Sequence, residues 1–279
     1  MISRGDRWQW TWFVVLAATL LLLATIAISS RWRAEPVQPG SPAAAAEPLE
    51  EPSVSGTTRP SEPAEPSEPA EETLAEGVLQ LAGKVPSKGS GDFTFSSERG
   101  PVAGSKGTLR RFKVAVEKGS GEDVADFTER VRAVLEDERS WAGSGKFRLQ
   151  LVAGSDKADF TIYLATRVTA GRMCERGGTD IRIGGVPFTS CRTSGKAIIN
   201  LDRWRKSSTP YLAAKAGLAE YRQYVINHEV GHELGHRHEG CPEAGGPAPV
   251  MVQQTLTLRG CTPYSWPRRN DKNLAGPRL

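Results

Sequence analysis

The chain has 279 residues, of which 38% are hydrophobic and 24% charged, and its formal net charge is +4. This length accommodates one domain of ordinary size with appendages. The charge is uneven, because residues 35–72 carry −8 whereas the residues from Thr73 onward carry +9. A basic domain favours anionic partners, although a solvated surface of mixed charge explains it equally well. No basic run alternates with aromatic residues, so no nucleic-acid partner is expected.

The N-terminal part contains an apolar run from Trp10 to Ile28 without a charged residue. A helix of that length, rising about 1.5 Å per residue, spans the hydrocarbon core of a bilayer. Tryptophans flank the run on both sides, as at the two interfaces of a membrane. We therefore predict a cytoplasmic tail at residues 1–9 and a transmembrane anchor at residues 10–30. A cleavable signal peptide, cut near Ala27–Ser29, is the alternative.

Residues 31–76 are predicted to be a disordered linker rich in Pro, Glu and Ala. Residues 35–72 contain nine prolines and nine glutamates and almost no large apolar side chains. Such a segment buries too little apolar surface to offset the entropy of ordering, and its prolines and like charges keep it extended. An inhibitory pro-segment is the other interpretation, but no cysteine lies before Cys174 to cap a metal.

Residues 77–279 are predicted to form one α+β domain with a twisted mixed sheet. Runs of alternating or continuous apolar residues predict strands, and apolar residues at helical spacing predict two helices. The predicted strands are Leu109–Glu117, Phe147–Val152, Ala158–Ala165 and Lys196–Leu201, and the predicted helices are Asp123–Glu136 and Ala213–Leu234.

The four cysteines of the chain all lie in this domain. An even number in an exported domain predicts two disulfides, for which three pairings exist. We favour the pairing that is local in sequence, Cys174–Cys191 and Cys241–Cys261. Thiolate metal ligands are the alternative, but the chain has no C-x-x-C spacing. Paired cysteines place the domain outside the cytoplasm, as the extracytoplasmic part of a single-pass cell-membrane protein.

All four histidines fall within the segment HEVGHELGHRH, residues 228–238. His228 and His232 are four residues apart, so on a helix both rings project from one face and can bind one ion. Gly235 tolerates a positive φ, which lets the helix end and the chain turn back. The turn brings His238 round as a third ligand.

Three histidine ligands leave a fourth position open, which is typical of a catalytic rather than a structural zinc site. Zinc in such a site lowers the pKa of water towards about 7 and polarises a carbonyl. Glu229, next to the first ligand, is predicted to act as the general base of peptide hydrolysis. We therefore expect one catalytic Zn²⁺ and a peptide or protein substrate. The alternative is a membrane-tethered, non-catalytic binding domain whose zinc is structural.

The complete pattern H-E-x-x-H-x-x-G-x-x-H resembles the signature of the metzincin zinc peptidases. The resemblance implies a zincin-like fold with a long active-site helix, and it gives Met251 the role of the methionine in the Met-turn beneath the metal. It also implies a cleft between the metal helix and an edge strand that pairs with an extended peptide. By chain order, Asp180–Ile183 is the candidate for that edge. Peptide stems of the cell wall remain a second substrate class.

The C-terminal part is more closely similar to a family of actinobacterial membrane-anchored or secreted zincin-like proteins, which implies a fold and a metal site but no substrate. Besides the histidine motif, the positions that carry this resemblance are Asn200, Arg203-Trp204, Tyr221-Arg222, Asn227, Cys241-Pro242, Ala248–Met251, Gln253–Thr255, Gly260-Cys261 and Trp266-Pro267.

Four residues near the motif have open roles. Gln253 stands where some metzincins have a tyrosine that approaches the metal, so that role is absent or falls elsewhere. Tyr264 is a candidate oxyanion donor, or else a packed tyrosine. His236 is expected to be exposed or to support the ligands rather than to bind the metal. Glu239 follows the third ligand as in the astacin branch, or is simply a solvated carboxylate.

Overall fold

The computed structural model describes residues 77–279. The predicted cytoplasmic tail, anchor and linker, at residues 1–9, 10–30 and 31–76, lie outside the described residues. Within residues 77–279, none of the helices combines the length and the apolar character that a membrane crossing requires.

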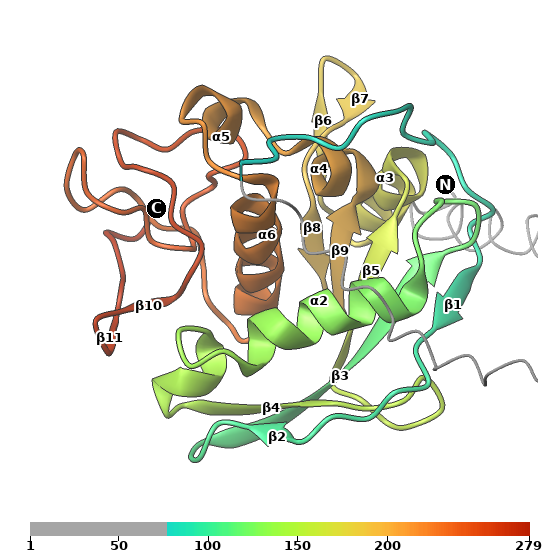
Figure 1. The fold of residues 1–279 in the computed structure, drawn as a ribbon, viewed down its shortest axis with the longest axis horizontal. Helices are drawn as coiled ribbons and strands as arrows, with labels where there is room; N and C mark the ends of the chain where they lie inside the picture. Colours follow the sequence, from blue (N-terminus) through green and yellow to red (C-terminus); the bar gives the residue numbers. More distant parts are fainter. Residues whose placement is uncertain (1–76) are drawn as a thin grey trace, which may run out of the picture. The chain divides into compact units, whose positions relative to one another are not determined.

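A mixed sheet of seven strands forms the centre of the described part (Figure 1). Its order is β2-β4-β3-β5-β9-β8, and β1 pairs with β3 off this path. β4, β3, β5 and β9 run parallel, whereas β2, β8 and β1 are antiparallel to their neighbours. The seven strands are β1 (Phe93–Phe95), β2 (Val102–Ala103), β3 (Thr108–Glu117), β4 (Phe147–Leu151), β5 (Phe160–Ala165), β8 (Cys191–Thr193) and β9 (Lys196–Asn200).

Helices cover both faces of this sheet, and two small hairpins lie outside it. The helices are α2 (Val124–Glu136), the 3₁₀ helix η1 (Trp141–Ser144), α3 (Arg167–Arg176), α4 (Leu201–Lys206), α5 (Thr209–Ala213) and α6 (Leu218–Glu233). The hairpins pair β6 (Arg182–Ile183) with β7 (Val186–Pro187), and β10 (Arg268–Arg269) with β11 (Lys272–Asn273). The α+β class and the mixed sheet are therefore as predicted.

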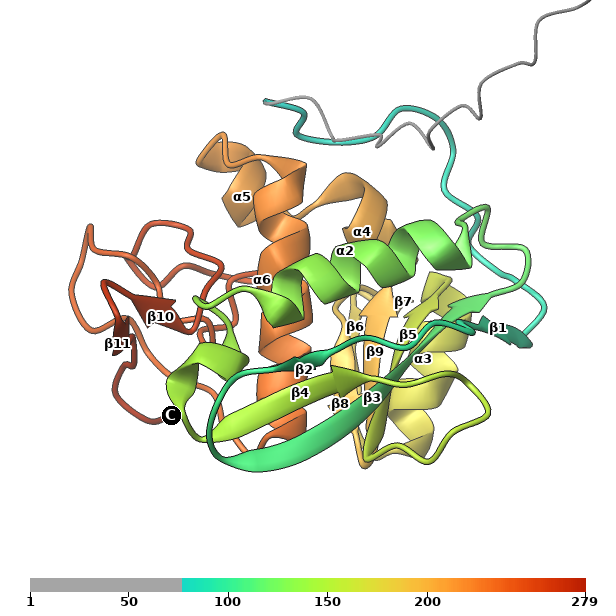
Figure 2. The same cartoon turned by 60° about the horizontal axis from the view of Figure 1, so that its bottom comes forward.

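The alternation of side chains along the strands assigns each helix to a face. On β5, Ile162 and Leu164 belong to the large core that also contains the buried side chains of α2 and α6. Ala165 and, on β9, Ile198 belong to a smaller cluster with Ala170 of α3. Successive residues of a strand point to opposite faces. It follows that α2 and α6 cover one face and α3 the other, and Figure 2 shows this arrangement.

The long helix predicted at Ala213–Leu234 is present as α6, but it begins later than predicted. α5 ends at Ala213 and α6 begins only at Leu218. Lys215 lies between them with a φ of 55°, in the left-handed region that a continuous right-handed helix cannot contain. Most side chains of α6 are buried, because the helix lies between the sheet, α2 and α4. The helix that carries the histidine motif is therefore part of the core.

Both predicted disulfides are present. Cys174–Cys191 joins α3 to the edge strand β8, and Cys241–Cys261 joins two irregular segments that follow α6. Between residues 77 and 279 no cysteine is free. Each bond closes a loop of about twenty residues, and both loops form part of the site described below.

Candidate metal centre

The second half of α6 brings three residues of the motif to one place. His228 and Glu229 are 6% and 4% exposed, and His232 is half-buried one turn later. Asn227, just before the motif, is fully buried and fixes this turn by its side chain. It accepts a hydrogen bond from the Ser140 hydroxyl at 2.8 Å and donates one to a backbone carbonyl beyond α6 at 3.0 Å.

The third histidine joins the pair after a sharp change of direction. Gly235 has a φ of 93°, which ends α6, and the amide of His236 donates back to the Gly231 carbonyl at 2.9 Å. His238 then returns to the helix, so that its Nε2 lies 3.1 Å from Nε2 of His232. One ligand atom from each of the three rings lies within 4.8 Å of the others.

Backbone carbonyls set the tautomers of the two helical histidines. His228 Nδ1 lies 2.8 Å from the Val250 carbonyl oxygen, and His232 Nδ1 lies 2.8 Å from that of His236. A carbonyl oxygen can only accept, so in both rings Nδ1 carries the hydrogen and donates. The lone pair is then on Nε2, at the ring edge that faces the cluster. A hydrogen bond from the ring nitrogen that does not face the metal orients metal-binding histidines in this way.

The surroundings keep all three rings neutral, which is the form that binds a metal. Burial is the largest cause for each of them. It lowers the pKa of His228 well below its usual range, lowers that of His232, and lowers that of His238 to about 4. His232 and Arg259 lower the pKa of His238 further by their charges.

Glu229 is a buried carboxyl group that lacks a compensating partner. Its Oε2 is among the few buried side-chain atoms of residues 77–279 that have no hydrogen-bond partner. Burial raises the pKa of Glu229 to about 8. A divalent cation beside this group would favour the ionised carboxylate and lower that pKa. Three converging neutral imidazoles next to such a carboxyl group fit a zinc ion.

Met251 lies under the turn of α6 that joins the two helical histidines. A Cβ atom on Gly231 would be 2.6 Å from the Met251 sulfur and 2.7 Å from the ring of Trp141, so only glycine admits both side chains there. The Met251 carbonyl accepts a hydrogen bond from the amide of Glu239 at 3.1 Å. The turn around Met251 therefore touches the helix and also the segment that carries the third histidine.

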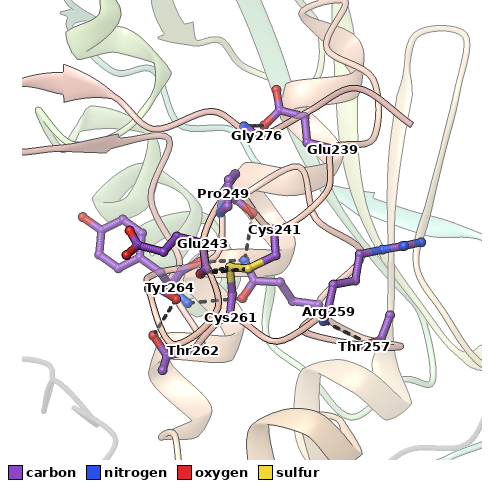
Figure 3. Close-up of a disulfide and its surroundings, with 12 residues drawn as sticks. Glu239, Cys241, Glu243, Pro249, Thr257, Arg259, Cys261, Thr262, Tyr264 and Gly276 are labelled. Carbon is purple, nitrogen blue, oxygen red and sulfur yellow. Dashed lines mark hydrogen bonds between the residues drawn. A yellow bond between two sulfur atoms is a disulfide. The ribbon is translucent and has the colours of Figure 1, made fainter.

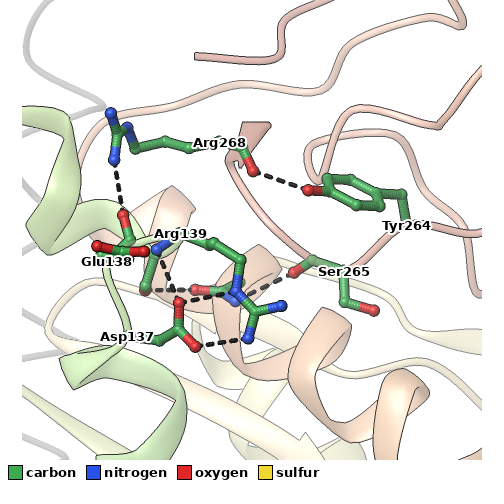
Figure 4. Close-up of polar contacts among 8 residues, drawn as sticks. Asp137, Glu138, Arg139, Tyr264, Ser265 and Arg268 are labelled. Atoms are coloured by element: carbon green, nitrogen blue, oxygen red, sulfur yellow. Dashed lines mark hydrogen bonds and ion pairs between the residues drawn. The ribbon is translucent and has the colours of Figure 1, made fainter. Parts of the chain in front are cut away.

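The structure also settles the surroundings of three residues with open roles. The ring of His236 stacks on Trp141, with centroids 4.2 Å apart, and lies outside the histidine cluster. The Tyr264 hydroxyl donates to the Arg268 carbonyl at 2.9 Å (Figure 4) and does not line the cleft at the histidines. Glu239 accepts a hydrogen bond from the amide of Gly276 at 3.0 Å (Figure 3). Tyr264 and Glu239 therefore both have structural partners in the described part.

A cleft of about 540 Å³ opens above the histidines. Its floor contains the three histidines and Glu229. Residues 179–183 and 189–191 line it and lie within the loop that Cys174–Cys191 closes. Gln253, Thr255 and Leu256 also line it and lie within the loop that Cys241–Cys261 closes. Much of the cleft wall therefore comes from two disulfide-closed loops, whereas much of the floor comes from α6.

The edge of the main sheet at the cleft is β8, and the prediction of Asp180–Ile183 as that edge is wrong. Arg182 and Ile183 form their own hairpin with β7, turning at Gly184 and Gly185, whose φ angles are 58° and 81°. Two adjacent residues in the left-handed region make a tight turn, and this turn keeps Arg182 and Ile183 in the hairpin and out of the main sheet. The segment Asp180–Ile183 still lines the cleft.

The pairing of β8 leaves one residue with its backbone groups at the open edge. The amide of Thr161 donates to the Gly195 carbonyl, so the odd-numbered residues of β9 face β5 and the even-numbered ones face β8. Cys191 and Thr193 pair with even-numbered residues of β9. The N–H and C=O of Arg192, between them, therefore point away from the sheet, and Arg192 lines the cleft.

Sequence reasoning missed the ion pair that joins this edge to α6. Arg192 Nε lies 2.9 Å from Glu233 Oε1, and the same oxygen accepts from the amide of Lys196 at 3.0 Å. Glu233 is 7% exposed. The signal in the sequence was a carboxylate directly after the second motif histidine, at a position that the helix buries.

The fold and the site define a class: an α+β protein with a mixed sheet and a candidate three-histidine metal centre on its long helix. The chain belongs to the family described as Protein of unknown function (DUF3152), whose model matches residues 79–268. Neither the comparison with curated proteins nor the comparison with solved structures gives a match. The matched residues include the whole histidine cluster and end before residues 269–279.

Proposed function

We propose that the protein is a zinc-dependent endopeptidase that hydrolyses peptide bonds in proteins or peptides outside the cytoplasm. One observation carries the proposal: Glu229, a buried carboxyl group with an unpartnered oxygen, lines the cleft that also contains three converging histidines. A site that only stabilises the fold needs ligands, but it does not need an unpaired buried carboxyl group beside them.

His228, His232 and His238 would hold the zinc ion through their Nε2 atoms. When bound, zinc supplies Lewis acidity, which polarises a carbonyl group and makes water a nucleophile at neutral pH. The carbonyls of Val250 and His236 keep the two helical rings in the tautomer and orientation that this binding needs.

Glu229 is the proposed general base. Its carboxylate takes a proton from the attacking water and returns it to the nitrogen of the leaving amine as the C–N bond breaks. Substrate would lie along the cleft, where the outward N–H and C=O of Arg192 are free to pair with an extended backbone. Strand pairing of this kind reads the peptide backbone, so the side chains of the walls would set selectivity.

Two further features support the proposal, one for a zincin-like fold and one for a domain outside the cytoplasm. Met251 packs against Gly231 under the histidine turn, as the Met-turn interpretation requires. The two disulfides favour an oxidising compartment and hence a domain outside the cytoplasm. The apolar residues 10–30 are the proposed anchor.

Hydrolysis of a mixed peptide library by the full chain tests the proposal. We expect cleavage that a chelator abolishes and added zinc restores. A chain that binds one zinc ion, keeps its fold and cleaves nothing in the library would favour the alternative, a tethered binding domain with a structural zinc.

A further inference from the structure

The last four residues of the chain pack beside the third histidine. Glu239 and Arg278 form an antiparallel β-bridge. The amide of Gly240 donates to the Pro277 carbonyl at 2.7 Å, and the amide of Leu279 donates to the His238 carbonyl at 3.3 Å. We call residues 276–279 the C-terminal segment; it lies outside the residues that the family model matches.

Glycines make this contact close. A Cβ atom on Gly276 would lie only 2.0 Å from the Gly240 carbonyl oxygen, and one on Gly240 would lie 3.2 Å from Pro277. The amide of Gly276 also donates to Glu239 Oε2 at 3.0 Å (Figure 3). Backbone hydrogen bonds and the Glu239 carboxylate therefore hold the C-terminal segment against residues 238–240, and the two glycines allow the close approach.

The opposite side of residues 238–240 is held by the turn around Met251, whose carbonyl accepts from the amide of Glu239. The segment that bears the third histidine is thus the middle one of three adjacent segments. This middle segment is not helical. Helix α6 fixes the backbone of His228 and His232, whereas hydrogen bonds to the two neighbouring segments fix the backbone next to His238.

The ring of His238 has less support than the other two. His228 and His232 each donate from Nδ1 to a carbonyl, whereas within residues 77–279 the only hydrogen bond of the His238 ring joins its Nε2 to His232. The position of His238 Nε2 therefore depends on its backbone, which Leu279, Pro277 and Met251 hold through residues 238–240.

We propose that the C-terminal segment is a positioning element of the metal centre: by fixing residues 238–240 it keeps His238 in place to bind zinc. The inference rests on the proposed function, because it takes His238 as a ligand. Its expected consequence is a zinc affinity that depends on residues 276–279, although none of them is a ligand.

Zinc affinity of the full chain, measured by competition with a chelator, tests the inference. A chain that ends at Ala275 and the variant Gly276→Ala should both bind zinc about 10- to 100-fold more weakly, the usual effect of losing support for a metal ligand. Lys272→Ala is the control, since this exposed side chain lies in the preceding hairpin and takes no part in the contact.

A double-mutant cycle separates positioning from a general loss of stability. If the C-terminal segment acts through the third ligand, Gly276→Ala weakens zinc binding in the native chain but causes no further loss in a His238→Ala background. Equal losses in both backgrounds, or unchanged affinity in both altered chains, would overturn the inference and leave the proposed function intact. A native chain that binds no zinc would overturn both.

Discussion

The candidate metal centre has two halves that are built in different ways. His228, Glu229 and His232 lie on α6, a helix that the sheet, α2 and α4 surround. His238 and Met251 lie in the irregular part that follows, which is held by a disulfide, close glycine contacts and the C-terminal segment. In the first half the chain conformation follows from helix packing, and in the second half it follows from contacts between distant residues.

This difference indicates where the site is preorganised and where it can be disturbed. On α6, the two histidines cannot separate without unfolding the core helix. In the second half, the third histidine lies in a segment outside any helix, residues 238–240, which is hydrogen-bonded to Met251 on one side and to the C-terminal segment on the other. Changes to the irregular part should therefore alter metal affinity and the cleft while leaving the helix in place, and the following predictions test this contrast.

The largest expected effect is the loss of zinc binding when a helical ligand is removed. We expect His228→Ala to leave the purified chain with far less than one zinc, because the two remaining histidines bind the ion much more weakly than three. His236→Ala is the matched control: its ring stacks on Trp141, outside the cluster, and its backbone carbonyl still orients His232. Elemental analysis of both variants measures the difference, and equal zinc contents would contradict the ligand assignment.

Removal of each disulfide compares the two walls of the cleft. Replacing either pair of cysteines by alanine should lower the free energy of unfolding by about 2–5 kcal/mol. The pair Cys241 and Cys261 encloses Met251, so its loss should also weaken zinc binding. The pair Cys174 and Cys191 encloses residues 179–183, so its loss should raise KM and leave zinc affinity unchanged. Urea unfolding, zinc titration and peptide kinetics distinguish the two, and identical zinc affinities would contradict the contrast.

Gly231→Ala tests the contact between the two halves. Its Cβ would press against Met251 and Trp141, so we expect a loss of about 1–3 kcal/mol in the free energy of unfolding, as for an overpacked core. Gly217→Ala serves as the control, because the nearest atom to its Cβ would be 3.9 Å away. Urea denaturation measures both variants, and an equal, small loss for the two would mean that Met251 does not pack tightly under the helix.

The smallest expected effect is a change in KM when a charged side chain of the cleft wall is removed. Arg237 lines the cleft and forms no ion pair within residues 77–279, so it is available to a carboxylate of the substrate. Arg237→Ala should raise KM about two- to fivefold for peptides with an acidic residue, since an exposed pair contributes up to about 1 kcal/mol. Arg182→Ala should not, because Arg182 already pairs with Asp180 and Glu175. An equal change for acidic and neutral peptides would exclude this role.

The sequence predicted the regular half of the molecule better than the irregular one. β3, β5, β9 and α2 have apolar patterns of strand or helix period, and the structure contains each near its predicted limits. The strands β1, β2 and β8 have two or three residues, too few for a pattern. The break before α6 depends on the backbone of Lys215, which no apolar period reveals.

In the candidate site, too, the regular half was easier to predict than the irregular one. The spacing of His228 and His232 predicted that the two rings lie together on one face of a helix, because helix geometry fixes which residues share a face, and the structure brings them together. The support of His238 was not predictable: the backbone amides and carbonyls of residues 238–240 and 276–279 form it, and these groups have no sequence signature. The tight turn that removed Asp180–Ile183 from the sheet edge does have a signal in the sequence, because the pair Gly184-Gly185 between two short runs favours a hairpin.

Comparison of Glu229→Gln with the native chain, by zinc content and by the rate of peptide cleavage, tests the central claim most directly. The substitution keeps the shape of the buried side chain and removes only its ability to take a proton. The account predicts one zinc per chain in both proteins and a rate about 10²- to 10⁴-fold lower in the variant, the usual contribution of a general base. Equal rates in two zinc-loaded proteins would contradict it.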